Sequence, residues 1–245
     1  MALGKVSPGM RLFWAALAAS ILGTLSQLIA FVSPYWYQSW RRVHSPLANV
    51  GLWHICLSGY VKPRDPTMQS YVGCWWIHSS FFRDVADFIM PPWFRGCQAL
   101  GIFEVLCNLA ILLLLIMYIA GESTRRKFYA DRHVLMFIIN SVICFASALF
   151  VFIVSLVFAE MARQENYFPR PWMNYLSWSY GFNVLSGFFM AFAGICLFIK
   201  SMILKDKLFE EPSSEIEKEL RMTPRQGAET ESGGGTGSKV GESFV

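Results

Sequence analysis

The sequence predicts an all-α membrane protein whose chain crosses the bilayer four times. Of its 245 residues, 54% are hydrophobic and 16% are aromatic, a composition that few soluble domains have. The charged residues also leave four long gaps, interrupted only by Glu104. Because a spanning helix needs about 20 apolar residues, we place one in each gap, at residues 12–33, 97–120, 134–159 and 178–200.

The first span is expected to stay in the mature protein. Residues 12–33 form a longer apolar stretch than the core of a secretory signal. They run directly into Ser33-Pro34-Tyr35-Trp36, which has no small-residue cleavage pattern. We therefore interpret this segment as an anchor.

Basic residues near the ends of the spans predict the orientation. Four spans put both termini on one side of the membrane, and Lys and Arg accumulate in short cytoplasmic segments. We therefore expect the segments 1–11, 121–133 and 201–245 to be cytoplasmic. The loops 34–96 and 160–177 are then extracellular. The basic residues behind this assignment are Lys5, Arg11, Arg125, Arg126, Lys127, Arg132, Lys200, Lys205 and Lys207.

Two cysteines of the first loop, Cys56 and Cys74, are expected to form a disulfide. An extracellular loop folds in the oxidising secretory pathway, where two thiols on one loop pair. The alternative is a zinc site, because His54 and His78 stand close to these cysteines at spacings that suit metal ligands. The compartment favours the disulfide. The other four cysteines lie in or near the spans, as packing residues: Cys97, Cys107, Cys144 and Cys196.

The first loop is expected to fold as a small domain. Residues 50–57 and 71–77 are rich in β-branched and aromatic side chains, and the segment between them contains two prolines. Residues 34–43 are a third candidate strand. A short helix that begins near Ser79 and Ser80 completes the loop.

A pattern of tryptophan, glycine and cysteine residues runs through this loop. Trp36 follows Pro34, then Gly51-Leu52-Trp53 stands just before Cys56, and Cys74 comes later. This order, in the first loop of a four-span chain, resembles the signature of the claudin family, within the claudin and peripheral myelin protein superfamily. The second loop is also similar to that of claudins, in Asn166-Tyr167-Phe168-Pro169 and Ser177-Trp178-Ser179-Tyr180-Gly181.

The resemblance implies a left-handed bundle of four transmembrane helices that carries a small extracellular antiparallel β-sheet. The first loop would supply most strands of this sheet, and the second loop would add one. Cys56 and Cys74 are separated by 17 residues, more than vertebrate claudins usually have, and Gln98 stands where many claudins have an arginine. The cysteine spacing fits an invertebrate claudin of the septate-junction type better, whereas Gln98 is closer to the myelin-protein branch of the superfamily.

The function that this resemblance implies is structural. Claudin-like proteins assemble with others of their kind in cis and in trans at lateral cell junctions, where they contribute to the paracellular barrier and to adhesion. An open sheet edge and exposed aromatic residues suit such contacts, and Trp75, Trp76 and Trp93 are candidates. Their alternative is burial under the sheet, or a place in an aromatic belt at the bilayer surface.

A second hypothesis is a tetraspan auxiliary subunit that regulates the trafficking or gating of a channel or receptor. We do not expect an enzyme, because the sequence offers no nucleophile with its base, no metal cluster and no phosphate-binding loop. No cofactor, metal or nucleic-acid partner is expected, and the surroundings of the spans are membrane lipid.

The tail differs from the rest of the chain in composition. Its Gly-rich and Ser-rich end is typical of a disordered linker, after a short predicted helix at 214–222. It finishes in Glu242-Ser243-Phe244-Val245, which matches a class I PDZ ligand: a PDZ domain adds such a segment as a strand and binds its carboxylate. We therefore predict a cytoplasmic PDZ scaffold as a partner.

Glu104 is the single acidic residue inside a predicted span. An intramembrane carboxyl group suggests either ion transport or a hydrogen-bonded structural role. Transport normally uses several such groups, so a neutral structural glutamate is favoured. The other strongly polar side chains at membrane depth are Gln27, Asn108, Asn140 and Asn183.

Overall fold

A computed structural model describes residues 7–40, 45–62, 68–123, 130–164, 167 and 171–222. The chain divides into two compact units, residues 1–205 and residues 206–245. The first unit holds the helical bundle and the sheet. The four residues of the predicted PDZ ligand, 242–245, lie outside the described residues.

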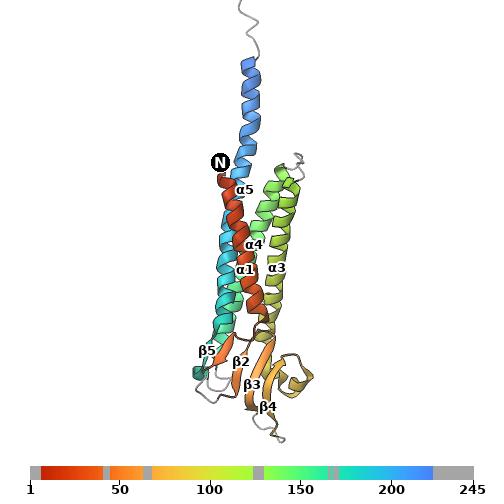
Figure 1. Cartoon of the computed structure of the whole chain (residues 1–245), viewed down its shortest axis with the longest axis vertical. Helices are drawn as coiled ribbons and strands as arrows, with labels where there is room; N and C mark the ends of the chain where they lie inside the picture. Colours follow the sequence, from red (N-terminus) through yellow and green to blue (C-terminus); the bar gives the residue numbers. More distant parts are fainter. Residues whose placement is uncertain are drawn as a thin grey trace, which may run out of the picture. The chain divides into compact units, whose positions relative to one another are not determined.

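Four long helices make up most of the first unit: α1 (Pro8–Val32), α3 (Pro92–Ser123), α4 (Ala130–Ala162) and α5 (Trp178–Met222). Their apolar stretches, at 8–32, 92–121, 133–162 and 178–207, are long enough to cross a membrane. Figure 1 shows these stretches side by side as a bundle. Large apolar side chains such as Leu113, Val142 and Phe188 are exposed on it, as expected of surfaces that face lipid. The four-helix prediction is confirmed.

The helices extend beyond the predicted spans. α3 begins at Pro92 instead of residue 97, because a proline is well suited to the first turn of a helix. α5 continues to Met222, so residues 201–222 are helical where the sequence predicted a disordered tail. Residues 201–222 contain many Lys, Glu and Leu residues, which have high helix propensity. The short helix predicted at 214–222 is part of α5.

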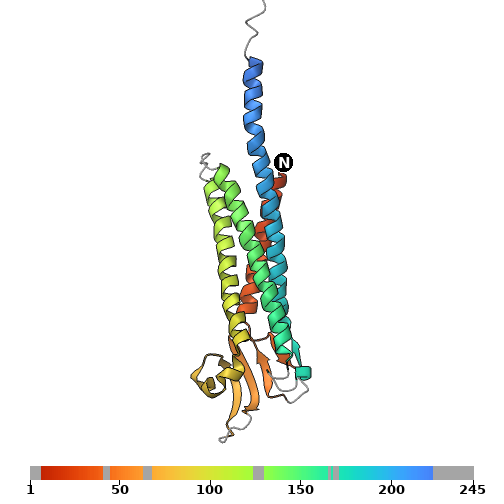
Figure 2. The same cartoon turned by 180° about the vertical axis from the view of Figure 1, so that it is seen from behind.

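A five-stranded sheet lies at one end of the bundle, at the C-terminal end of α1 and the N-terminal end of α3 (Figures 1 and 2). Its neighbouring strands are antiparallel, in the order β4-β3-β2-β1-β5. The first loop contributes four strands and the second loop contributes β5, as the resemblance implied. The strands are β1 (Tyr37–Ser39), β2 (Leu47–Val50), β3 (His54–Val61), β4 (Ser70–Trp76) and β5 (Asn174–Leu176).

The prediction of one strand over residues 50–57 is wrong. The chain turns at Gly51-Leu52-Trp53, so this stretch forms the end of β2, a turn and the start of β3. β-propensity did not reveal the turn, because Leu and Trp are themselves common in strands. The strand predicted at 34–43 is shorter and is described only at Tyr37–Ser39.

The short helix after β4 is present. It consists of a 3-10 turn, η1 (Ser80–Val85), and one α-helical turn, α2 (Ala86–Ile89). The Ser79 hydroxyl accepts a hydrogen bond from the Phe81 amide, as the capping prediction required. Phe82, Val85 and Ile89 are buried against the sheet side of the core. A further 3-10 turn, η3 (Pro171–Met173), leads into β5.

Two hydrophobic clusters hold the first unit together. The larger one lies between the sheet and the bundle, and it includes the fully buried Trp36, Leu52, Phe94 and Phe158. The second lies among the helices and includes Phe13, Phe137 and Met190. The larger cluster therefore anchors the sheet rigidly to the ends of the helices.

Candidate adhesive surface and its support

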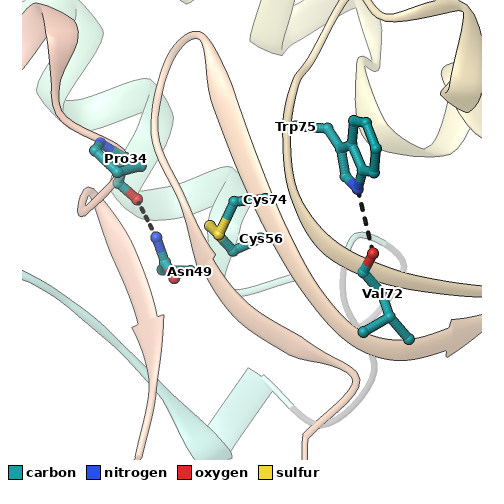
Figure 3. The surroundings of a disulfide bond; sticks show 6 residues. All are labelled: Pro34, Asn49, Cys56, Val72, Cys74 and Trp75. Carbon is teal, nitrogen blue, oxygen red and sulfur yellow. Dashed lines mark hydrogen bonds between the residues drawn. A yellow bond between two sulfur atoms is a disulfide. The ribbon is translucent and has the colours of Figure 1, made fainter.

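The disulfide joins two directly opposed residues of β3 and β4 (Figure 3). Cys56 pairs with Cys74 in the register of the sheet, with the Cα atoms 4.0 Å apart and an S–S distance of 2.06 Å. Closing a loop with a sequence separation of 18 residues stabilises the folded state by about 3 kcal/mol in the chain-entropy model. Both thiols are used in this bond, so they cannot serve as zinc ligands with His54 and His78. His54 instead packs edge-on against Trp76.

Trp36 connects the sheet to three helices. Its side chain is fully buried, and its indole Nε1 donates a hydrogen bond of 2.6 Å to the carbonyl of Ala30. Ala30 lies in the last turn of α1, where carbonyl groups lack helical partners. The ring packs against Phe158 of α4 at 5.0 Å between centroids, and against Tyr180 of α5 at 6.1 Å. The signature tryptophan therefore fixes the position of β1 on the bundle.

Gly51 permits the closest approach between the sheet and the end of α1. A Cβ atom at this position would lie 2.2 Å from the carbonyl oxygen of Ser33 and 2.6 Å from the Cα of Pro34. Its amide donates to the carbonyl of His54, which closes the turn between β2 and β3. The side chain of Asn49 adds a hydrogen bond of 3.0 Å to the carbonyl of Pro34 (Figure 3). Only glycine fits this contact without displacing backbone atoms.

Leu52 and Trp53 connect the same turn to α3 and α1. Leu52 is fully buried, and its carbonyl accepts a hydrogen bond of 2.6 Å from the Gln98 side chain of α3. Trp53 packs against Phe31 of α1 at 5.2 Å between ring centroids. The role of Gln98 was missed by the sequence reasoning, which treated it only as a departure from the claudin pattern. A polar residue at the outer end of a span was the available signal.

The structure thus brings together the six predicted signature residues in one region, around the sheet and its junction with the helices. Trp36, Leu52 and Cys56 are buried, and Trp53 is half-buried. These side chains support the sheet and offer little surface for a partner. Any contact surface must come from the edges and the outer face of the sheet.

The edge formed by β4 is partly protected. The amide of Ile77 donates to the carbonyl of Trp53, so the alternation of antiparallel pairing directs the backbone groups of Val72 away from β3. The indole of Trp75 donates to the Val72 carbonyl at 3.2 Å (Figure 3). Trp75 is 43% exposed and Trp76 is 50% exposed, so these two candidates are not buried under the sheet.

Trp93 behaves differently from the other two candidates. Its ring lies 4.8 Å from Tyr167 and packs against Phe158, at the junction of the sheet and the bundle. It is half-buried in the larger core cluster. Of the roles considered for Trp93, burial therefore describes it better than contact with a partner.

Among the described residues, β5 is the strand at the opposite edge of the sheet. The amide of Ser177 donates to the carbonyl of Trp36, and the amide of Trp40 donates to the carbonyl of Met173. By the same alternation, Asn174 and Leu176 direct their backbone groups away from β1. Backbone groups that point away from a sheet at its edge are a template for pairing with another strand.

A hollow of about 470 Å³ lies beside β5. Trp172, on its wall, is 68% exposed, and the ring of Tyr175 packs against Trp40 at 4.5 Å. An edge strand and aromatic side chains are therefore found together at this end of the sheet. The hollow is lined by Tyr37, Arg163, Pro171, Trp172, Asn174, Tyr175 and Leu176.

Within the described ranges, the structure places no three His, Cys, Asp or Glu side chains so that they can hold a metal ion. The five-stranded sheet and its junction with the helices are held together by side-chain packing, backbone pairing and one covalent cross-link.

Comparison with known families agrees with this architecture. Residues 21–199 match the family model described as PMP-22/EMP/MP20/claudin tight junction. No individual curated protein matches the sequence. The matched range includes the sheet, the disulfide, the second half of the first apolar helical stretch, all of the second and third, and most of the fourth. The chain is thus a multi-pass plasma membrane protein that belongs to the PMP-22/EMP/MP20/claudin family.

Proposed function

We propose that this protein is a claudin-like component of lateral cell junctions, of the septate or tight type, which contributes to the paracellular barrier and to adhesion. The observation that carries the proposal is the position of β5 at the edge of the sheet beside the aromatic hollow, on a sheet attached rigidly to a membrane bundle. This edge is positioned to pair with another copy or a related protein, in the same membrane or on the opposing cell.

The distribution of basic residues supports an orientation with the sheet outside the cell. Arg11 stands near the start of α1, while Lys200, Lys205 and Lys207 stand near the end of the apolar part of α5. The start of α1 lies at the end of the bundle remote from the sheet (Figure 1). Short basic flanks of this kind are retained on the cytoplasmic side, so both termini are cytoplasmic in the proposal.

The cytoplasmic tail supplies the second contact. Glu242-Ser243-Phe244-Val245 is proposed to bind a PDZ scaffold, with the Val245 side chain in a pocket and its carboxylate bound by backbone amides. The scaffold would hold the protein at the junction. Deleting Val245 should release it from the lateral membrane band without changing its folding.

The decisive experiment is tracer permeability across an epithelium that lacks the protein. Re-expression of the wild-type chain should restore the barrier, whereas Trp172→Ser should restore it less well at equal surface levels. Met68→Ser is the control, because Met68 is 78% exposed on the same outer domain but far along the sheet from β5. An epithelium that stays tight without the protein would contradict the proposal.

The same experiment can instead support a channel-regulating role. In that case the protein would copurify with one channel or receptor at fixed stoichiometry, and its loss would alter a membrane current while the barrier stayed intact. A band of labelled protein confined to lateral contacts, with a leaky epithelium on loss, separates the junctional role from this one.

A further inference from the structure

A group of polar side chains lies deep inside the helical bundle. Gln27 comes from α1, Glu104 from α3, and Asn183 and Ser186 from α5. Each is at most 1% exposed, and Glu104 lies near the middle of the apolar stretch 92–121. Polar groups at this depth are costly unless they are hydrogen-bonded or neutral.

The geometry around the Ser186 hydroxyl leaves too few hydrogens. Its Oγ lies 2.9 Å from Oε1 of Gln27, 3.4 Å from Oε1 of Glu104 and 2.8 Å from the carbonyl oxygen of Asn183. A serine hydroxyl has one hydrogen to donate. It therefore serves one of the three oxygen atoms at a time.

Exchanging the oxygen and nitrogen of the Gln27 amide removes one part of this conflict. Nε2 of Gln27 is buried without a partner, and in the exchanged orientation it donates to Ser186. The exchange does not help Glu104, whose Oε2 is also buried without a partner. The carboxyl group then has a share of the Ser186 hydroxyl at 3.4 Å, with the Gln27 side chain as its other polar neighbour.

An ionised carboxylate does not fit these surroundings. The hydrogen bond found for Glu104 comes from Ser186, and no Lys, Arg or His pairs with it among the described residues. A buried carboxylate normally requires a cation or several donors. A carboxylic acid, by contrast, brings its own hydrogen and can donate it to the Ser186 oxygen.

We propose that Glu104 is a proton-binding site inside the membrane, occupied at neutral pH, and that its acid hydrogen bond to Ser186 links α3 to α1 and α5. The bound species is a single proton that the carboxylate takes from a hydronium ion as the bundle assembles: one O–H bond forms on the carboxyl group, one breaks in hydronium, and water is released. With this hydrogen in place, the acid donates to the hydroxyl oxygen of Ser186. The Ser186 hydroxyl then donates to the carbonyl oxygen of Asn183 or to the side-chain amide oxygen of Gln27.

One further hydrogen bond extends this link to α4, and a second one joins α4 to α3 close to Glu104. The Asn183 amide donates to the Ser155 hydroxyl at 3.0 Å, and the Ser147 hydroxyl donates to Asn108 at 2.6 Å. Asn108 lies one helical turn from Glu104 on the same face of α3. The proton on Glu104 thus completes a buried network with members on each of the four spanning helices.

The test is infrared spectroscopy of the full chain in lipid nanodiscs at neutral pH. We expect the C=O stretching band of a protonated carboxylic acid, which shifts in deuterium oxide and is absent from the Glu104→Gln variant. Absence of this band, or its persistence in Glu104→Gln, would overturn the proposal.

Two serine variants test the assigned partner while keeping Glu104. Ser186→Ala should move the acid band to higher frequency, because the acid loses its hydrogen-bond acceptor. Ser141→Ala is the matched control: it removes a buried hydroxyl that donates to the carbonyl of Gly194, outside this network, and should leave the band in place. An acid band that does not move in Ser186→Ala, or that moves equally in both, would overturn the link between Glu104 and Ser186. These variants also decide the question if Glu104→Gln does not fold.

Discussion

The ammonium nitrogen of Lys200 lies 4.3 Å from the centre of the Phe13 ring, although Phe13 belongs to α1 and Lys200 to α5. The same nitrogen lies 4.6 Å from the ring centre of Tyr118 in α3 and 4.5 Å from that of Phe137 in α4. Lys200 is only 7% exposed. One cation is therefore surrounded by aromatic rings from the three other helices, near the end of the bundle away from the sheet.

Replacing Lys200 by Met should lower the thermal stability of the purified protein. The substitution keeps an apolar stem of similar length but removes the cation–π attraction, which is worth about 2 kcal/mol when desolvated. Lys200→Arg should retain part of this cation–π attraction. Lys207→Met, at an exposed position of α5, is the control. Equal melting temperatures for Lys200→Met and Lys207→Met in detergent would show that the aromatic surroundings contribute nothing.

Gly51→Ala should disrupt the junction between the sheet and α1. The added methyl group meets backbone atoms of Ser33 and Pro34, which cannot rotate away as a side chain can, and overpacking of this kind costs about 1–3 kcal/mol. We expect retention inside the cell and little protein at the surface, measured by surface biotinylation. Gly96→Ala is the control, since no atom lies within 4 Å of a Cβ there. Normal surface levels of Gly51→Ala would refute the close contact.

Two substitutions at Trp36 separate its hydrogen bond from its packing. Trp36→Phe keeps an aromatic ring but loses the donor to Ala30, which costs about 1 kcal/mol, because the Ser179 hydroxyl still donates to the same carbonyl. Trp36→Ala should cost about 3–5 kcal/mol. Chemical denaturation in detergent measures both. Trp172→Phe, at an exposed tryptophan, should be neutral; a Trp36→Ala variant as stable as Trp172→Phe would contradict the anchoring role.

The sheet and its junction with the helices should lose stability at strongly alkaline pH. Burial raises the pKa of Tyr167 well above its ordinary value, and its hydroxyl donates to the carbonyl of Ile89. An unfolded tyrosine ionises near pH 10. The stabilisation is therefore complete below that pH and is lost as the pH rises through the raised pKa, because ionisation then favours the unfolded chain.

Tyr167→Phe tests this assignment through the slope of stability against pH. Above about pH 10, the free energy of unfolding should fall less steeply with pH for the variant than for the wild type. Denaturation at a series of pH values measures both slopes. The comparison at neutral pH is the control, where the two slopes should agree. Identical slopes above pH 10 would exclude Tyr167 as the responsible group.

The helices and the cross-link followed from local information. A bilayer admits few backbone arrangements, so long apolar gaps between charges predict helices without knowledge of their neighbours. Cys56 and Cys74 were an obvious pair because one loop, predicted to be extracellular, contains both. The short helix near Ser79 was predicted for the same reason, since a cap and a following proline act within a few residues.

Other features depended on contacts between distant segments. Gly51 ends β2 because the backbone at Ser33 lies against it, a fact that strand propensity at residues 50–57 does not contain. Gln98 acquired a role only when α3 brought it to the carbonyl of Leu52. Similarly, Trp75 and Trp93 look alike in sequence, but one lies on an exposed edge and the other in the core.

By itself, then, the sequence determined the number of spanning helices, the cysteine pair and the family, because these depend on composition and on short spacings. Only the tertiary structure decided which polar and charged side chains meet inside the bundle. Glu104 meets Ser186, and Lys200 meets Phe13, across helices far apart in the chain. Such pairings arise from the way four helices pack together, and no single helix encodes its neighbour's position.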